Sequence, residues 1–192
     1  DQRIYNGSDG KLMMASPQVL IITGEIETGK TSLCLEIAGI AREAGIKVAG
    51  ILSPSVFQEN DKIAIDVLNL KNWERQRLAE LRDHRQSGLV TQRWSFIPEA
   101  VYWGNQILKD VMPCDLFMLD ELGPLEFHRN QGWVSGFEAV ERGDYQAALL
   151  VIRPSLLDEA ARRWEITRVI DLSDPLLTPM TGKDLFETLI FQ

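Results

Sequence analysis

The sequence predicts an α/β fold with a mostly parallel sheet that is covered by helices on both faces. Three observations carry this prediction. A hydrophobic run, a glycine-containing loop and a helical pattern follow one another over residues 18–44. A second hydrophobic run, over residues 115–121, ends in two adjacent acids. The rest of the chain alternates between strand-like and helix-like segments, which favours parallel strands joined by right-handed crossovers.

The first unit of the predicted fold is a strand, a helix and a second strand. An apolar run predicts the first strand over residues 18–23. Apolar residues at helical spacing predict a helix over residues 30–44, and Gly45 is typical of a helix end. The second strand follows over residues 47–52.

The next segments extend this unit. Alternating apolar and polar residues around a polar turn predict an inserted β-hairpin within residues 53–70. Residues 71–88 carry several arginines among acids, so they form either a solvated, salt-bridged helix or loop, or a mobile basic flap over phosphates. Residues 93–96 predict a short strand, and Pro98 is well suited to begin a helix over residues 98–111.

The second half of the chain continues the alternation. After the acid-tipped strand, a Gly-Pro turn over residues 123–127 leads the chain away from the sheet. We expect further strands over residues 146–152 and 166–171. We expect further helices over residues 132–142, 155–162 and 181–190.

The stretch Gly24–Thr31 matches the phosphate-binding pattern G-x-x-x-x-G-K-[ST] in full, and its place between a strand and a helix argues against a chance Gly/Lys turn. Backbone N–H groups of such a loop, with the positive end of the helix dipole, hold a polyphosphate. Lys30 is expected to reach the β- and γ-phosphates, and the Thr31 hydroxyl to coordinate Mg²⁺.

The residues expected to bind the nucleotide share this loop and the first turn of the helix. They are Gly24, Glu25, Ile26, Glu27, Thr28, Gly29, Lys30, Thr31 and Ser32. Two of them are acids in a loop that binds an anion. We therefore expect the Glu25 and Glu27 carboxylates to point to solvent or to be paired.

The strand over residues 115–121 ends in Asp120 and Glu121. In proteins with this loop, such a strand lies beside the strand of the glycine loop, where Asp120 would hold Mg²⁺ and Glu121 would act as the base that orients the attacking water. The alternative is a strand that simply ends in solvent. The glycine loop upstream favours the functional interpretation.

Ligands of parallel α/β sheets bind outside the carboxyl ends of the strands. Gly24, Asp120, Glu121 and Arg153 all fall at such ends in the predicted fold. Arg153 could therefore stabilise charge on the transferred phosphoryl group. An ion pair between Arg153 and a neighbouring acid is the structural alternative.

The composition suits one domain over residues 17–192, behind a flexible arm over residues 1–16. The net charge of −8 argues against a duplex nucleic-acid surface. No apolar run long enough to span a membrane and no signal peptide is evident, so we expect a cytoplasmic protein without a membrane partner. Cys34 and Cys114 lack C-x-x-C spacing and are interpreted as buried thiols. Nothing in the sequence identifies a protein partner.

Several stretches together resemble the small P-loop nucleoside-triphosphatases, the family that includes the cancer-related nucleoside-triphosphatase and its thermophile relatives. The resemblance covers most of residues 18–171. Its most specific part is LDELGPLEF, and it also includes the loop GEIETGKT, the hairpin and RWSFIPEAVYWGNQIL. It implies a RecA-like core and slow, base-tolerant, Mg²⁺-dependent hydrolysis of nucleoside triphosphates.

Position by position, the resemblance gives Gly24, Gly29, Lys30 and Thr31 the phosphate and metal roles. It makes Asp120 the metal-side acid and Glu121 the base, and it places Glu126 on the family's second acid, with a structural or metal-proximal role. The loop departs from the family, which usually has Pro or Gly at the positions of Glu25, Ile26 and Glu27.

Three functions are compatible with these residues. The first is nucleoside-triphosphate hydrolysis, with Lys30, Glu121 and Arg153 as the catalytic residues. The second is phosphoryl transfer from ATP to a small metabolite, for which residues 71–85 are the candidate lid. The third is a non-catalytic nucleotide-dependent switch, motivated by the acidic loop and the hairpin. Phosphate release without an acceptor distinguishes the first from the others.

Overall fold

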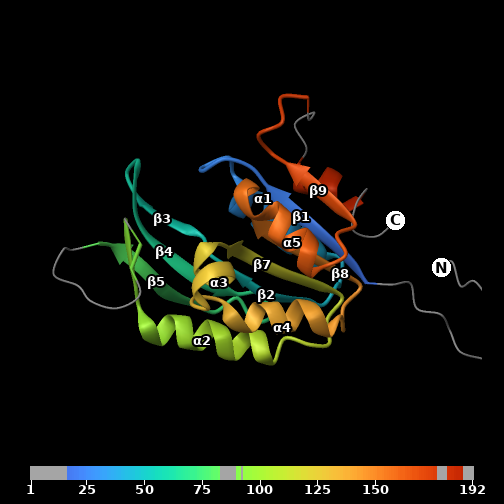
Figure 1. The fold of residues 1–192 in the computed structure, drawn as a ribbon, viewed down its shortest axis with the longest axis horizontal. Coiled ribbons are helices and arrows are strands. Elements are labelled where there is room, and N and C mark those ends of the chain that lie inside the picture. The colour runs from blue at the N-terminus through green and yellow to red at the C-terminus, as the bar shows by residue number, and fades with distance from the viewer. Residues whose placement is uncertain (1–16, 83–89, 92, 177–180, 188–192) are drawn as a thin grey trace, which may run out of the picture.

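The computed structural model of the chain describes residues 17–82, 90–91, 93–176 and 181–187. The predicted arm over residues 1–16 lies outside the described residues. The described part contains a nine-stranded mixed sheet with helices on both faces (Figure 1). The α/β prediction is therefore confirmed.

The strands lie in the order β6-β5-β4-β2-β7-β8-β1-β9, and β3 pairs with β4 outside this path. Their bounds are β1 Gln18–Thr23, β2 Val48–Leu52, β3 Ser55–Gln58, β4 Asp61–Asn69, β5 Arg75–Leu81, β6 Trp94–Phe96, β7 Leu116–Leu122, β8 Ala147–Ile152 and β9 Arg168–Asp171. The strands β2, β7, β8, β1 and β9 are parallel. The strands β3 to β6 extend this parallel sheet by antiparallel pairing.

The helices fall close to the predicted segments. They are α1 Lys30–Glu43, α2 Pro98–Lys109, α3 Pro124–Arg129, α4 Val134–Arg142, α5 Leu157–Arg163 after a 3₁₀ turn at Pro154–Leu156, and α6 Gly182–Leu185. Gly45 has a φ of 77°, as a residue that ends a helix in the left-handed conformation does. Residues 188–190, the end of the predicted last helix, lie outside the described residues.

Two apolar layers hold the helices to the sheet. Alternate residues of a strand point to opposite faces, so Leu20 and Ile22 of β1 pack with α1 and α6. Val19 and Ile21 of the same strand belong to the layer that contains α2, α4 and α5. Figure 1 shows α2 and α4 side by side along the sheet. Because both faces are covered, the central strands carry continuous apolar runs, such as Val19–Ile22 and Leu116–Leu119, and do not alternate.

The predicted position of the acid-tipped strand is wrong. We expected β7 to lie directly beside β1, but β8 lies between them and pairs in parallel with both. β8 is apolar and completely buried, as a strand with neighbours on both sides must be. The acids at the end of β7 therefore lie two strands away from the glycine loop, and α1 must bridge that distance.

The interpretation of residues 71–88 as a helix, loop or flap is also wrong for Arg75–Leu81, although residues 71–74 do form a turn between two strands. Arg75–Leu81 forms strand β5, antiparallel to β4, and Leu78 and Ala79 are buried in the core. Arg77 Nε donates a hydrogen bond to Asp66 Oδ1 of β4 at 2.8 Å. The charged side chains of this segment therefore lie on a strand next to the edge of the sheet. Residues 83–89 lie outside the described residues.

One smaller difference concerns a turn. Residues 123–127 were expected to form only a turn, but Pro124–Arg129 is a short helix, α3. The inserted hairpin is confirmed, since β3 and β4 are antiparallel and joined at Glu59, whose φ is 55°. No helix in the described ranges has the length and apolar composition needed to cross a membrane.

Candidate active site

The glycine loop joins β1 to α1 and follows the backbone that the pattern requires. Gly24 has a φ of 138° and Gly29 a φ of 87°, both conformations that favour glycine. A Cβ on Gly24 would lie 3.0 Å from Ser173 Oγ and from Thr28 Oγ1, so a side chain there would also crowd the loop. Gly29 is the N-cap of α1, which directs the first N–H groups of the helix at the loop.

The two acids of the loop are exposed and so leave the expected anion site free of their charge. Glu25 and Glu27 are exposed, as expected for carboxylates that point to solvent, and Ile26 between them is 80% exposed. Glu27 has a φ of 65°, in the left-handed region. Glu25 contributes its backbone to the site instead, since its N–H donates a hydrogen bond to Ser173 Oγ at 2.7 Å.

Lys30 lies inside the loop. Its Nζ donates hydrogen bonds to the Gly24 carbonyl at 2.9 Å, to the Glu25 carbonyl and to Thr28 Oγ1 at 3.2 Å. Burial lowers the pKa of Lys30, while the charges of Glu121 and Asp120 raise it. The ammonium is therefore held between the loop and the acids of β7 by neutral oxygens, from which it can transfer to phosphate oxygens.

Thr31 connects the glycine loop to the distant acid. Its Oγ1 donates a hydrogen bond to Asp120 Oδ2 at 2.8 Å, so α1 bridges across β8 to the end of β7. The Ser53 N–H, directly after β2, donates to the same oxygen at 3.2 Å. Asp120 is fully buried, and its other oxygen, Oδ1, has no hydrogen-bond partner among the described residues.

This donor set fits Mg²⁺. Mg²⁺ prefers oxygen ligands and is usually held by one or two protein groups together with water and phosphate oxygens. A buried carboxylate with one unpartnered oxygen, beside the Thr31 hydroxyl, provides such groups. In the described residues no cluster of three or more His, Cys, Asp or Glu side chains could hold a metal ion. A metal at Asp120 would thus depend on the phosphates for its remaining ligands.

We expect the metal-free protein to lose stability as the pH rises from about 4 to about 6. Burial, assisted by the charge of Glu121, raises the pKa of Asp120 from 3.8 to about 6. Within this window the folded chain holds a proton that the unfolded chain has lost, so a rise in pH favours unfolding. The difference in pKa corresponds to a decrease on the order of 3 kcal/mol in the free energy of unfolding.

Denaturant unfolding at several pH values between 4 and 7 measures this effect, with the Asp120→Asn variant as the control. The variant should lack the contribution of Asp120 and keep that of Glu126, whose pKa is also raised, first of all by burial. Parallel stability curves for parent and variant across this range would contradict the prediction.

Glu121 sits in a β-bulge. The pairing of β7 with β8 shifts register between Leu119 and Leu122, and Glu121 has a φ of 60°. A non-glycine residue in this left-handed region costs about 1–2 kcal/mol. The bulge turns the exposed Glu121 side chain out of the alternation of the strand. Strained residues of this kind are concentrated at functional sites.

Arg153 lies at the carboxyl end of β8, beside the Asp-Glu-Leu-Gly turn. A Cβ on Gly123 would lie 4.0 Å from Arg153 Nε, and the charge of Arg153 contributes to lowering the pKa of Lys30, after burial. Arg153 is exposed, and no hydrogen bond or ion pair joins it to another described residue. The described contacts therefore give no support to the alternative of a structural ion pair.

The carboxylate of Glu126 is held by two backbone N–H groups, and neither belongs to the expected metal ligands Thr31 and Asp120. Its Oε2 accepts a hydrogen bond from the Gly123 N–H and its Oε1 one from the Trp133 N–H, each at 2.8 Å. Glu126 is buried, and both carboxylate oxygens are occupied by backbone donors. Of the two roles that the resemblance allows, the structure favours the structural one.

Sequence reasoning missed Ser53 and Ser173. Ser53 follows β2 and donates its N–H to Asp120, and Ser173 follows β9 and contacts the glycine loop. Both lie just after the carboxyl end of a parallel strand. The rule that ligands bind outside the carboxyl ends of parallel strands predicted Gly24 and Asp120, and it would also have predicted Ser53 and Ser173.

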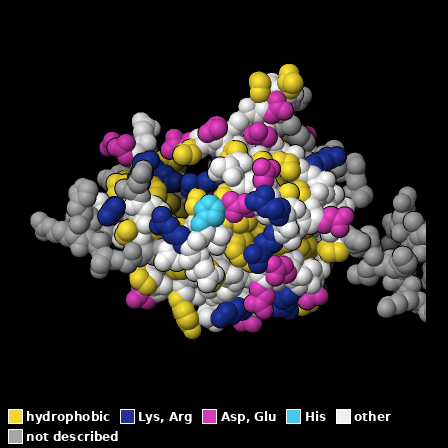
Figure 2. All heavy atoms as spheres, in the orientation of Figure 1, with side chains coloured by type: hydrophobic (Ala, Val, Ile, Leu, Met, Phe, Trp, Pro, Cys, Tyr) yellow, Lys and Arg dark blue, Asp and Glu magenta, His cyan; other side chains and the backbone are white. Residues whose placement is uncertain are grey.

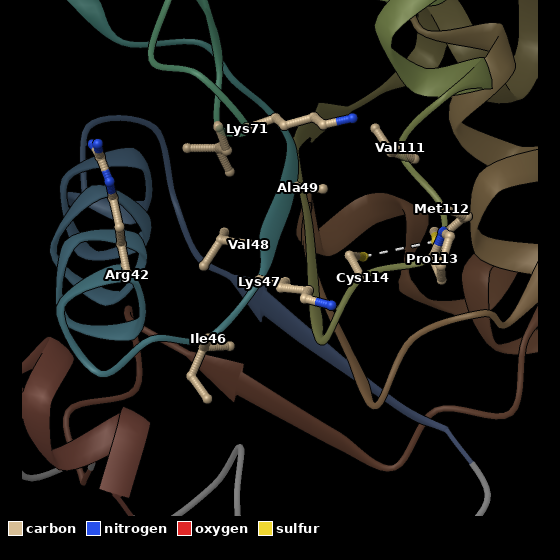
Figure 3. A pocket seen from close by; sticks show the side chains of 11 residues that line it. Arg42, Ile46, Lys47, Val48, Ala49, Lys71, Val111, Met112, Pro113 and Cys114 are labelled. Carbon is tan, nitrogen blue, oxygen red and sulfur yellow. Dashed lines mark hydrogen bonds between the residues drawn. The ribbon is translucent and has the colours of Figure 1, made fainter.

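The surface agrees with an anion site at this edge. Figure 2 shows Lys and Arg side chains around a hollow between the β3–β4 hairpin and the helices α1 and α3, in a chain of net charge −8. A second hollow of about 320 Å³ lies at the opposite, amino ends of β2 and β7, where Lys47 and Lys71 border apolar walls (Figure 3). None of the predicted nucleotide-binding residues lines the second hollow.

Comparison with known proteins agrees with this geometry. A model of the NTPase family matches residues 19–152, which include the glycine loop, the acids of β7 and all of β8. The chain belongs to the NTPase family. Curated relatives include nucleoside-triphosphatase THEP1 of Methanopyrus kandleri, 27% identical over 59% of the chain and 62% of the relative, and of Methanosarcina barkeri, 23% identical over 77% and 85%. The first relatives are thus matched over about three fifths of their own length.

Two solved structures share the fold. A human cancer-related nucleoside triphosphatase superposes with a TM-score of 0.63 at 18% identity, covering 88% of this chain and 94% of that one. THEP1 of Aquifex aeolicus gives a TM-score of 0.62 at 16% identity, covering 91% and 100%. The P-loop NTPase fold expected from the sequence is therefore confirmed.

Proposed function

We propose that this protein hydrolyses nucleoside triphosphates to nucleoside diphosphate and phosphate with Mg²⁺, slowly and with tolerance for the base. The observation that carries the proposal is the 2.8 Å hydrogen bond from Thr31 Oγ1 to Asp120 Oδ2. It joins the first turn after the phosphate loop to a buried acid whose second oxygen has no partner among the described residues. The NTPase family match and the general name of the relatives support a substrate class that is not defined by its base.

Each residue has a defined part in this reaction. The loop N–H groups and Lys30 bind the phosphates, and Lys30 exchanges its carbonyl partners for phosphate oxygens. Thr31 and Asp120 would hold Mg²⁺, which would supply positive charge against the phosphates. The Glu121 carboxylate accepts a proton from the attacking water as the water oxygen bonds to the γ-phosphorus. The bond from the γ-phosphorus to the bridging oxygen breaks, and the nucleoside diphosphate leaves with that oxygen. Arg153 faces the charge that develops on the phosphoryl group.

A phosphate-release assay tests the proposal. ATP, GTP, CTP and UTP are supplied one at a time, with Mg²⁺ or with a chelator, to the parent chain and to Asp120→Asn. We expect the parent to release phosphate from several of these nucleotides, and only when Mg²⁺ is present. Asp120→Asn should release none. Tight nucleotide binding without release would favour the switch instead, and release only in the presence of an acceptor would favour a kinase.

The kinase alternative has lost its best argument. It relied on residues 71–85 as a basic lid, and Arg75–Leu81 is a strand paired within the sheet.

We also propose a reducing, cytoplasmic location. It is supported by Cys34 and Cys114, which are buried free thiols.

We expect Arg153→Ala to lower kcat by about tenfold with little change in nucleotide affinity. The effect should be far smaller than the roughly 10³–10⁵ of an enclosed arginine finger, because Arg153 is exposed and its charge is screened by solvent. Steady-state phosphate release and nucleotide binding measure the two quantities. Arg162→Ala, an exposed arginine on α5, is the control. A change in melting temperature alone would contradict the assignment.

A further inference from the structure

Glu126 ties together two segments that flank the turn after the catalytic acids. Its Oε2 accepts from Gly123, the N-cap of α3, and its Oε1 accepts from Trp133, the N-cap of α4. The side chain is only 6% exposed. Because each carboxylate oxygen is buried and accepts one backbone N–H, the side chain links the start of α3 to the start of α4. We call this arrangement the Glu126 clamp.

The clamp lies directly after the bulge that carries Glu121. Before the bulge, β7 is fixed by the pairing of Leu119 with Leu150, and after it by the pairing of Leu122 with Ile152. The next residue is Gly123, whose N–H is held by the clamp. Two contacts therefore fix the chain after Glu121, whose backbone is left-handed. They are the pairing of Leu122 with Ile152 and the hydrogen bond from the Gly123 N–H to Glu126.

The surroundings leave the clamp little freedom. Gly132 has a φ of 74°, and a Cβ there would lie 2.0 Å from Glu126 Oε1. Trp133 is buried against α2, where a Cβ on Gly104 would lie 2.4 Å from the indole ring. The second anchor of the clamp therefore belongs to the packed core between α2 and the sheet.

We propose that Glu126 is a positioning residue, which through Gly123 and Trp133 holds the strained bulge so that Glu121 faces the attacking water. This inference rests on the proposed hydrolysis. It assigns to Glu126 no contact with substrate or metal. The role also accounts for a carboxylate at this buried position. Two backbone N–H groups need two acceptor oxygens, and an amide side chain has only one.

Two variants break the clamp from opposite sides. Glu126→Gln keeps the shape of the side chain but places an NH₂ group against one of the two N–H donors. Gly132→Ala leaves the carboxylate intact and pushes it away from Trp133. Gly143→Ala is the matched control, because Gly143 ends α4 with a similar φ of 67° and a Cβ there would meet only Pro17 Cγ, at 3.6 Å.

The measurements are kcat for phosphate release, affinity for a non-hydrolysable triphosphate, and amide hydrogen exchange at Gly123 and Trp133. We expect Glu126→Gln and Gly132→Ala to lower kcat by about 10- to 100-fold, the range that a displacement of about 1 Å can cause. Affinity should stay within about twofold of the parent, because the glycine loop is untouched. Gly132→Ala and the control Gly143→Ala should both have a lower melting temperature because of backbone strain. Of these two variants, only Gly132→Ala should also have a lower kcat and faster amide exchange at Gly123.

The outcomes separate this inference from the function on which it rests. An active parent with clamp variants that match Gly143→Ala in kcat and exchange overturns the positioning role and leaves hydrolysis standing. A parent without phosphate release overturns the proposed hydrolysis. An equal loss of affinity and kcat in the clamp variants would show a general structural role and overturn the inference as well.

Discussion

Replacing Glu121 by Gln is expected to lower the turnover of nucleoside triphosphate by about 10²–10⁴-fold, the contribution typical of a general base. Glutamine preserves the length and the hydrogen-bonding shape of the side chain but cannot accept the proton of water. Nucleotide affinity should be nearly unchanged, because the phosphates are held by the loop, Lys30 and the first turn of α1.

The control for this variant is Glu59→Gln. Glu59 is also exposed and left-handed, with a φ of 55°, but lies in the β3–β4 turn. It should hydrolyse like the parent. Glu121→Gly adds a second comparison, since glycine relieves the strain at a φ of 60° and should raise the melting temperature while turnover is lost. Turnover of Glu121→Gln equal to that of Glu59→Gln would remove Glu121 from the mechanism.

The second large effect is expected for Lys30→Ala, which should weaken both nucleotide binding and turnover. A charge-assisted hydrogen bond to phosphate contributes about 1.5–3 kcal/mol, which predicts a loss of affinity of about 10- to 100-fold. Loss of a donor that faces the developing charge should lower kcat by about 10²–10³-fold in addition. The variant also loses the bonds from Nζ to Gly24 and Thr28, so the loop itself is less constrained.

Titration with a fluorescent triphosphate and phosphate release separate the two losses. Lys47→Ala is the control, because Lys47 is exposed and borders the hollow at the opposite ends of the strands. Lys30→Arg should not restore the parent, since the guanidinium fork does not replace a compact ammonium inside the loop. Unchanged affinity in Lys30→Ala would contradict the assignment of the glycine loop as the phosphate site.

The sequence by itself determined the parts of the site that are contiguous. Strand, glycine loop and helix follow one another within residues 18–44, so a pattern of apolar residues and two glycines defines both the local backbone and the roles of Lys30 and Thr31. The acids at the end of β7 were found for the same reason, since an apolar run that stops at Asp120 marks the end of a buried strand. Neighbours in the chain share one local conformation, which the residues encode directly.

Tertiary structure decided what joins these parts. Strand order depends on pairing between segments far apart in the chain, so only the fold placed β8 between β1 and β7 and made Arg75–Leu81 a strand. Likewise, Thr31 meets Asp120 across 89 positions of the chain. The Glu126 clamp and the bulge at Glu121 arise because buried backbone groups must find partners wherever packing brings them. Those partners are selected by the completed core, and no local pattern of residues records them.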